Sequence, residues 1–126
     1  MYLLVNLSEK EKIRLAIFDE QRRKDCQSFG QNRALLFCID GFLREHGQDK
    51  KEVQGIMAVV GEGSFTSTRL AVTVANAFAY ALQIPLLAVN KNQVDKAQDL
   101  IPKLLKQPKG RYISATYSGE PNIRIK

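Results

Sequence analysis

The chain is poor in the side chains that enzymes use for acid–base, nucleophilic and metal chemistry. Its 126 residues include one histidine and two cysteines, and Cys26 and Cys38 have neither a C-x-x-C nor a zinc-site spacing. No group of histidine, cysteine and carboxylate residues has metal-ligand spacing, so no metal and no cofactor is predicted. His46 precedes Gly47 at the end of a predicted helix. This position favours an interaction with the negative end of the helix dipole over a role as a catalytic base. The sequence therefore favours a protein that is not an enzyme.

Long apolar runs, repeats and low-complexity tracts are also missing. No stretch approaches the ~18 apolar residues of a membrane helix. The N-terminal residues 1–6 are too short for the apolar part of a signal peptide and have no basic residues before them. Two free thiols are usual in a cytoplasmic protein. We expect one cytoplasmic domain, residues 1–126, without membrane contact.

Acidic residues are scarce in the second half of the chain. Residues 1–63 carry ten Lys/Arg and ten Asp/Glu, whereas residues 64–126 carry nine and three, so the net charge of +6 lies in the second half. A basic half faces nucleic acid, faces an acidic protein, or is a solvated surface. The candidate nucleic-acid contacts are Lys106, Lys109, Arg111 and Tyr112.

Apolar patterns predict the order of strands and helices. Strands are expected at 2–8, 12–20, 23–29, 56–60 and 85–89, and helices at 32–45, with Asn32 as a possible N-cap, and 66–82. Residues 93–107 predict an amphipathic helix that Pro102 kinks or splits, and 112–117 and 122–126 predict strands in the tail.

Strands joined by short turns pair antiparallel, and strands joined through helices pair parallel. The prediction is an α/β fold with a mixed sheet in βββαβαβα order and a short β tail. This is the order of a single ribonuclease-H-like lobe, the building block of actin-like ATPases.

Two predicted helices carry more apolar surface than one sheet can cover. The helix at 66–82 is apolar nearly all round, which is typical of a helix buried on more than one side. In the helix at 32–45, the apolar stripe is Leu35, Leu36, Ile39, Phe42 and Leu43. We expect an oligomer or partner interface formed by Phe37, Gly41, Arg44, Val72, Asn76, Ala79 and Tyr80. The alternatives are an apolar solvent face or cover from the third helix.

A glycine-containing loop joins the strand at 56–60 to the helix at 66–82. Its characteristic residues are Gly61, Gly63, Ser64, Thr66 and Arg69. A strand, a glycine turn and a helix N-terminus gather backbone N–H groups that can bind an anion. Thr66 stands where a dinucleotide motif needs a small residue, and the lysine of a P-loop is missing. The loop is either a tight turn that caps a buried helix or an anion or nucleotide site.

The end of the first strand argues against bound metal–phosphate. Residues 6–8 read Asn-Leu-Ser and lack the carboxylate that would hold such a complex.

The segment Val60–Arg69, VGEGSFTSTR, resembles the signature of the TsaB family, roughly G-P-G-S-F-T-G-L-R, and residues 83–86 resemble its later G-I-P-L. Residues 31–33 are similar to the family's helix opening. The resemblance covers about residues 2–92, the N-terminal lobe only, and 93–126 form a divergent kinked helix and basic β tail. Glu62 replaces the family's proline, Ser67-Thr68 replaces Gly-Leu, and Asn6-Leu7-Ser8 replaces the usual Asp-Thr-Ser. The second lobe of typical members is missing.

The resemblance implies a non-catalytic scaffold in the synthesis of threonylcarbamoyladenosine in tRNA. Members of the family pair through their first two helices with the related catalytic subunit TsaD, and they can self-associate through the same surface. The implied partner is a TsaD-like protein, with a homodimer expected in isolation. Two alternatives stay open. One is a nucleotide-binding actin-like relic of ATPase or phosphotransfer ancestry, and the other is a basic accessory that contacts tRNA.

Overall fold

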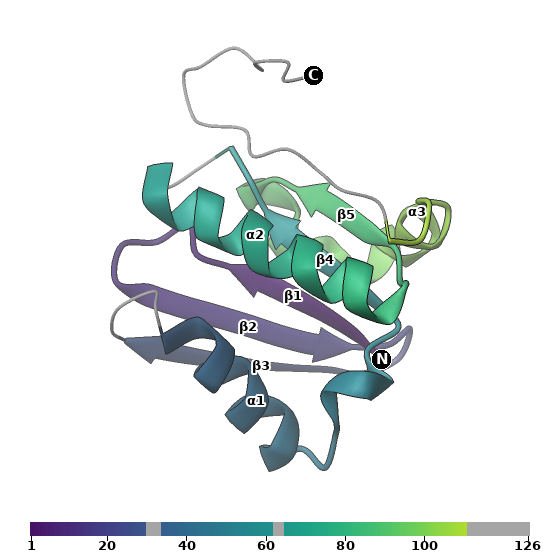
Figure 1. Cartoon of the computed structure of the whole chain (residues 1–126), viewed down its shortest axis with the longest axis horizontal. Coiled ribbons are helices and arrows are strands. Elements are labelled where there is room, and N and C mark those ends of the chain that lie inside the picture. Colours follow the sequence, from purple (N-terminus) through teal and green to yellow (C-terminus); the bar gives the residue numbers. More distant parts are fainter. Residues whose placement is uncertain (30–33, 62–64, 111–126) are drawn as a thin grey trace.

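The chain folds around one five-stranded mixed sheet. The structure is a computed structural model that describes residues 1–29, 34–61 and 65–110, without the side chains of 65 and 66. The strands are β1 (Tyr2–Asn6), β2 (Lys12–Phe18), β3 (Arg23–Phe29), β4 (Gly55–Val59) and β5 (Leu86–Val89). The helices are α1 (Leu35–Glu45), η2 (Lys50–Glu52), α2 (Phe65–Leu82), η3 (Lys91–Leu100) and α3 (Ile101–Leu105). The sheet order is β3-β2-β1-β4-β5 (Figure 1).

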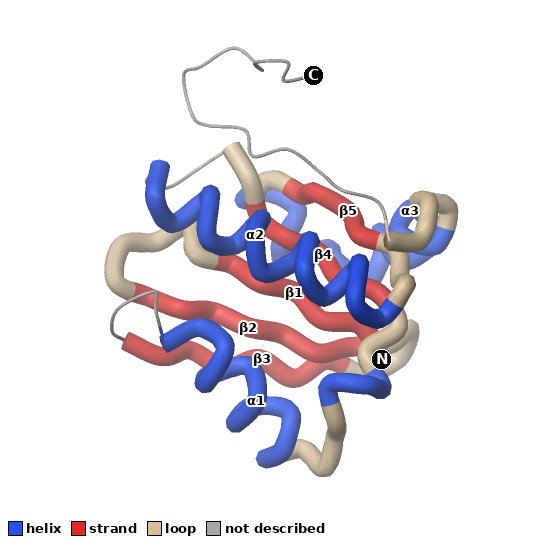
Figure 2. Tube along the Cα trace, viewed as in Figure 1, coloured by secondary structure: helices blue, strands red, loops and turns tan. Residues whose placement is uncertain are grey.

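The pairing directions confirm the predicted mixed sheet. β1, β2 and β3 pair antiparallel as a meander, and β1, β4 and β5 pair parallel through helical connections. Figure 2 shows the strands as a single layer with helices on both sides. The predicted tail strands at 112–117 and 122–126 lie outside the described residues.

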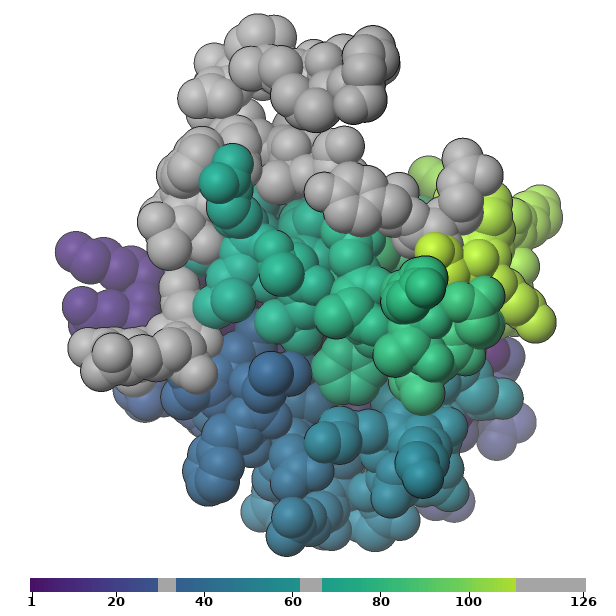
Figure 3. Space-filling view, viewed as in Figure 1, coloured from purple at the N-terminus to yellow at the C-terminus, as the bar shows by residue number. Residues whose placement is uncertain are grey.

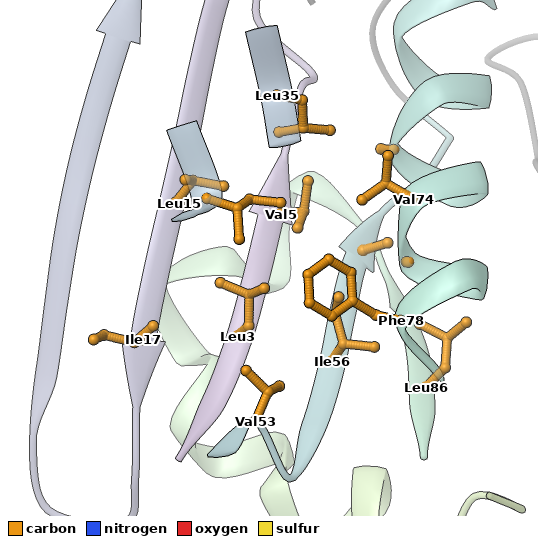
Figure 4. Close-up of a cluster of buried hydrophobic side chains, with 14 of the residues drawn as sticks. Leu3, Val5, Leu15, Ile17, Leu35, Val53, Ile56, Val74, Phe78 and Leu86 are labelled. Carbon is orange, nitrogen blue, oxygen red and sulfur yellow. The ribbon is translucent and has the colours of Figure 1, made fainter. Parts of the chain in front are cut away.

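Helices cover the two faces of the sheet with separate apolar cores. On one face, α1 and α2 pack over alternate strand residues such as Leu3 and Val5. Figure 4 shows Phe78 of α2 directed toward Ile56 of β4 in this core. On the other face, η3 and α3 pack over the intervening residues. Because β4 is buried on both faces, it reads as an unbroken apolar run.

The predicted helix at 93–107 differs from the structure. It begins earlier, at Lys91, and its first part is the 3₁₀ helix η3, with a non-helical residue at Lys96. The predicted split is confirmed, but it falls before Pro102, which sits in the first turn of α3, where a missing N–H costs no hydrogen bond. Arg23 and Gln98 tie η3 to the β2–β3 hairpin, as Arg23 Nη1 donates to the Val94 carbonyl (2.7 Å) and Gln98 Nε2 to that of Asp19 (2.9 Å).

The first helix ends where predicted, and its predicted start at residues 32–33 lies outside the described residues. α1 starts after Ala34, which makes no side-chain capping bond, and Asn32 lies outside the described residues. Gly47 ends the helix with φ +70°, while Gln48 N–H donates to the Leu43 carbonyl (2.8 Å). The charged loop at 48–54 contains η2, which is capped by Asp49.

Candidate functional site

At the carboxyl end of β1, the side chain of Asn6 is hydrogen-bonded within the turn that follows the strand. Asn6 is buried, and its Oδ1 accepts hydrogen bonds from Ser8 N–H (2.9 Å) and from Ser8 Oγ–H (2.6 Å). A catalytic phosphate turn would place a carboxylate at this point to hold metal–phosphate. Here the polar side chain stabilises the turn that leads out of β1.

The glycine loop begins with a conformation that favours glycine. Gly61, just after β4, has φ +85°, and a Cβ built there would meet nothing within 4 Å. Backbone conformation therefore explains this glycine. Gly63, Ser64 and the side chain of Thr66 lie outside the described residues. Arg69 is exposed near the start of α2. The anion site stays a prediction.

The outward faces of α1 and α2 form the larger candidate surface. Figure 3 shows the two helices side by side on one face, α1 in blue and α2 in teal to green. Phe37 on α1 is 82% exposed and Tyr80 on α2 is 73% exposed. Gly41 is open, since a Cβ there would meet nothing within 4 Å. Arg44 is exposed and pairs with Asp40 at 3.0 Å.

Two residues predicted for this interface lie inside the protein. Ala79 is 0% exposed and belongs to the core under α1 and α2, and Val72 is 4% exposed. Neither side chain is available to a second molecule in this fold, so their assignment is corrected. The helix is apolar all round, and its sequence did not distinguish the sheet-facing side from the outer side. Asn76 is half-buried.

Sequence reasoning also missed one surface residue. The apolar pattern places Leu36 in the core stripe, yet this side chain is 58% exposed beside Phe37. The core side of α1 is set by Leu35, Ile39 and Leu43, and Leu36 is turned about 100° from Leu35. This geometry was the available signal, because Leu36 lies at the margin of the stripe.

The basic C-terminal region is described only in part. Lys106 and Lys109 are exposed, while Arg111 and Tyr112 lie outside the described residues. Lys109 forms an isolated antiparallel β-bridge with Pro85, just before β5, and Gly110 N–H donates to the Ile84 carbonyl (3.0 Å). This contact places Lys109 and Gly110 beside the β5 edge of the sheet.

Cys26 and Glu9 have shifted pKa values, and neither belongs to the candidate helix interface or to the candidate nucleic-acid contacts. Burial raises the pKa of the Cys26 thiol, which makes it a weaker nucleophile near neutral pH. Hydrogen bonds from Lys12 and Arg14 lower the pKa of Glu9. Across residues 1–29, 34–61 and 65–110, no three histidine, cysteine or carboxylate residues gather as metal ligands. No helix in these ranges is long and apolar enough to span a bilayer.

Comparison with protein families gives a match over most of the chain. The family model described as "TsaD: tRNA N6-adenosine threonylcarbamoyltransferase" matches residues 31–117. The match includes α1, the glycine loop and α2. Among curated proteins, no match was found.

Solved structures give the same fold. YeaZ (TsaB) from Pseudomonas aeruginosa is 31% identical with a TM-score of 0.64, and the alignment covers 71% of this chain and 44% of that one. An uncharacterized protein with similarity to peptidase YEAZ from Pseudomonas aeruginosa is 30% identical, with the same TM-score and the same coverage of both chains. This chain therefore spans less than half the length of these neighbours. The likeness confirms the predicted ribonuclease-H-like, actin-like lobe and the resemblance to TsaB.

Proposed function

The chain belongs to the family described as "TsaD: tRNA N6-adenosine threonylcarbamoyltransferase", and we propose that it acts there as a non-catalytic, TsaB-like scaffold. In this role it pairs with a TsaD-like protein in the threonylcarbamoyladenosine modification of tRNA. The observation that carries the proposal is that α1 and α2 lie on one face of the molecule (Figure 3) and that each exposes an aromatic residue, Phe37 on α1 and Tyr80 on α2. Such a cytoplasmic subunit would keep both cysteines as thiols.

The chemistry of this face suits a protein partner. Fully burying one large apolar side chain contributes about 1.5–3 kcal/mol, and aromatic residues often dominate binding energy. Leu36 adds apolar area beside Phe37, and Gly41 lets a partner backbone approach closely. Arg44 lies at the exposed rim, where it can select an acidic partner surface. In the absence of a partner, the same face can serve a homodimer.

The non-catalytic role is supported by the hydrogen bonds that engage Asn6 at the end of β1. The Asn6 acceptor is engaged by Ser8, so it is not open toward a bound phosphate or metal. The competing nucleotide-binding relic would use the Gly61 loop and would be stabilised by ATP with magnesium, because a native-state ligand raises stability. Thermal unfolding with and without millimolar nucleotide distinguishes the two functions, and the scaffold predicts no shift.

Complex formation tests the scaffold directly. Light scattering after size exclusion of the chain mixed with the TsaD-like protein of the same organism should give one peak at the summed mass. Separate peaks at concentrations well above those in the cell would contradict the proposal.

A weaker contact with tRNA within the same complex is supported by the exposed lysines of α3 and its surroundings. Lys103, Lys106 and Lys109 all reach solvent. Binding of this kind is lost as salt rises. A tRNA affinity that is unchanged by replacing all three lysines with glutamine would remove this contact.

A further inference from the structure

One side of α2 is more deeply buried than the other. Phe78 points toward Ile56 of the core (Figure 4) and so marks the side of the helix that faces the sheet. Its two neighbours in the chain are alanines, and each lies about 100° from it around the helix, in opposite directions. Ala79 is 0% exposed, whereas Ala77 is exposed. Val72, which lies about 120° from Phe78 on the Ala79 side, is only 4% exposed.

The neighbour that buries Val72 lies outside the two apolar cores. Within the described ranges, the strands on which α2 packs are β4, β1 and β5. Ala79 belongs to the core on that face of the sheet, but Val72, although buried, belongs to neither core of the described residues. The sheet beneath Phe78 therefore explains the burial of Ala79 better than the burial of Val72.

The last described residue, Gly110, lies at the C-terminal end of α2. Its N–H donates to the Ile84 carbonyl (3.0 Å), and a Cβ built on it would lie 2.9 Å from Gln83 Nε2. The same Gln83 amide donates to the Tyr80 carbonyl (2.8 Å) in the last turn of the helix. Gln83 follows Val72 by eleven residues, which is about three turns of helix, so both lie on one side of it. The chain beyond Gly110 therefore begins on the Val72 side of α2.

This continuation is long enough to reach Val72. Eleven residues of α-helix rise about 16 Å, and about five residues of extended chain span the same distance. Residues 112–117 alternate in the manner of a strand, and one side of that strand is apolar. The apolar side consists of Ile113, Ala115 and Tyr117. Counted from Gly110 in an extended segment, Ala115 comes level with Val72.

We propose that residues 111–117, which lie outside the described residues, run as an extended segment along the Val72 side of α2, toward the N-terminus of the helix. Ala115 then packs on Val72, and Ile113 packs between Val72 and Ala79. The occupant of this side of the helix is thus the chain's own tail, tied at its start to the end of α2.

The docked tail limits how the helix surface can be used. Val72 and Ala79 are predicted from the sequence at an interface, and the tail keeps both out of reach of a second molecule. Phe37 and Tyr80 remain exposed on the outer side of α1 and α2. The tail is therefore an autoinhibitory cover for one side of α2. As a contact within one chain, it does not depend on the proposed function.

Cross-linking tests the contact directly. In a chain that carries Cys26→Ser and Cys38→Ser, the pair Val72→Cys and Ala115→Cys should form a disulfide within one molecule. Oxidised glutathione takes up the two electrons and two protons that the thiols lose, and it is reduced to two molecules of glutathione. The matched control pair, Thr73→Cys with Ala115→Cys, moves the α2 thiol about 100° around the helix to an exposed position.

Mass spectrometry of the intact, unreduced protein follows the cross-link with time. The proposal expects the Val72 pair to form its disulfide at least about tenfold faster than the control pair, because a docked tail raises the local thiol concentration. The comparison is repeated with Ser114→Cys and with Thr116→Cys, so that a shift of one residue in register does not hide the contact. Equal rates at all three positions would overturn the proposal, as would cross-links between two molecules in place of cross-links within one.

Thermal unfolding of the full chain gives an independent test. Ile113→Asp places a charge against the apolar side of α2 and should lower the unfolding midpoint by at least about 5 °C. Ser114→Asp adds the same charge on the opposite side of the segment and should change the midpoint by less than about 2 °C. An unchanged midpoint in Ile113→Asp, or equal shifts in the two variants, would show that this side of α2 is not covered by the tail.

Discussion

At the scale of the residue, two glycines near the end of α1 have opposite requirements. Gly41 is within the helix and Gly47 has φ +70°, while a Cβ added at either glycine would meet nothing within 4 Å. Gly41→Ala should therefore stabilise the fold by about 0.5–1 kcal/mol, because alanine favours helix. Gly47→Ala should destabilise it by about 1–2 kcal/mol, because a Cβ disfavours left-handed backbone. Urea unfolding at low protein concentration measures both, and equal effects would contradict the assignment.

The carboxylate of Glu9 makes stability depend on pH. Lys12 Nζ lies 3.2 Å from Oε1 and Arg14 Nη1 lies 2.9 Å from Oε2, and these contacts lower the pKa of Glu9. A lowered folded-state pKa adds stability above the ordinary value of 4.5, and this stability is lost as pH falls through the lowered value.

The wild-type chain should therefore be more stable than Glu9→Gln at pH 7, and the difference should disappear once the pH has fallen below the lowered pKa of Glu9. The midpoint of urea unfolding, measured for both proteins across this range, tests the expectation. A difference that stays constant with pH would assign the effect to packing.

At the scale of the element, α3 packs closely on β4 at Gly55. A Cβ at Gly55 would lie 2.8 Å from Leu104 Cδ2 and 3.1 Å from Tyr2 Cδ1. Gly55→Ala should cost about 1–3 kcal/mol of stability through overpacking, and Leu104→Ala about 2–5 kcal/mol through lost burial. In the double variant the new methyl group has room, so the combined cost should be at least about 0.5 kcal/mol below the sum. Additive costs would contradict close contact.

The elements show what the sequence could and could not predict. Apolar patterns predicted the strands, and β4 was recognisable as an unbroken apolar run because both of its faces are buried, while Gly47 marked the end of α1. The orientation of α2 could not be predicted, because the helix is apolar on nearly every side. Val72 and Ala79 were therefore expected on the outer side, but both are buried. The 3₁₀ geometry of η3 was also missed, because the spacing of Val94, Ala97 and Ile101 suits a helix of either kind.

The exposure of two candidate interface residues was predicted, and their role in binding stays a prediction. Phe37 and Tyr80 were found because they lie outside the apolar stripes, and Leu36 was missed because it lies beside one. The glycine loop was recognised from its sequence alone. Within this loop, the structure adds the positive φ of Gly61. Backbone conformation and side-chain burial depend on the tertiary fold, so residue patterns alone did not settle them.

At the scale of the whole molecule, the sheet separates two surfaces. α1 and α2 lie on one face with Phe37 and Tyr80 exposed, and η3 and α3 lie on the other, with Leu105 52% exposed. The two faces therefore carry separate exposed apolar residues. Leu105 provides a matched control, because it is also an exposed apolar residue on a helix.

The central claim is that the α1–α2 face binds a TsaD-like protein. Isothermal titration calorimetry of the chain with that protein tests it most directly, using Phe37→Asp, Tyr80→Asp and Leu105→Asp, with circular dichroism to check each fold. We predict that the first two variants weaken binding at least tenfold, the equivalent of about 1.4 kcal/mol, and that Leu105→Asp binds like the wild type. A wild-type chain that does not bind, or binding that all three variants leave unchanged, would contradict it.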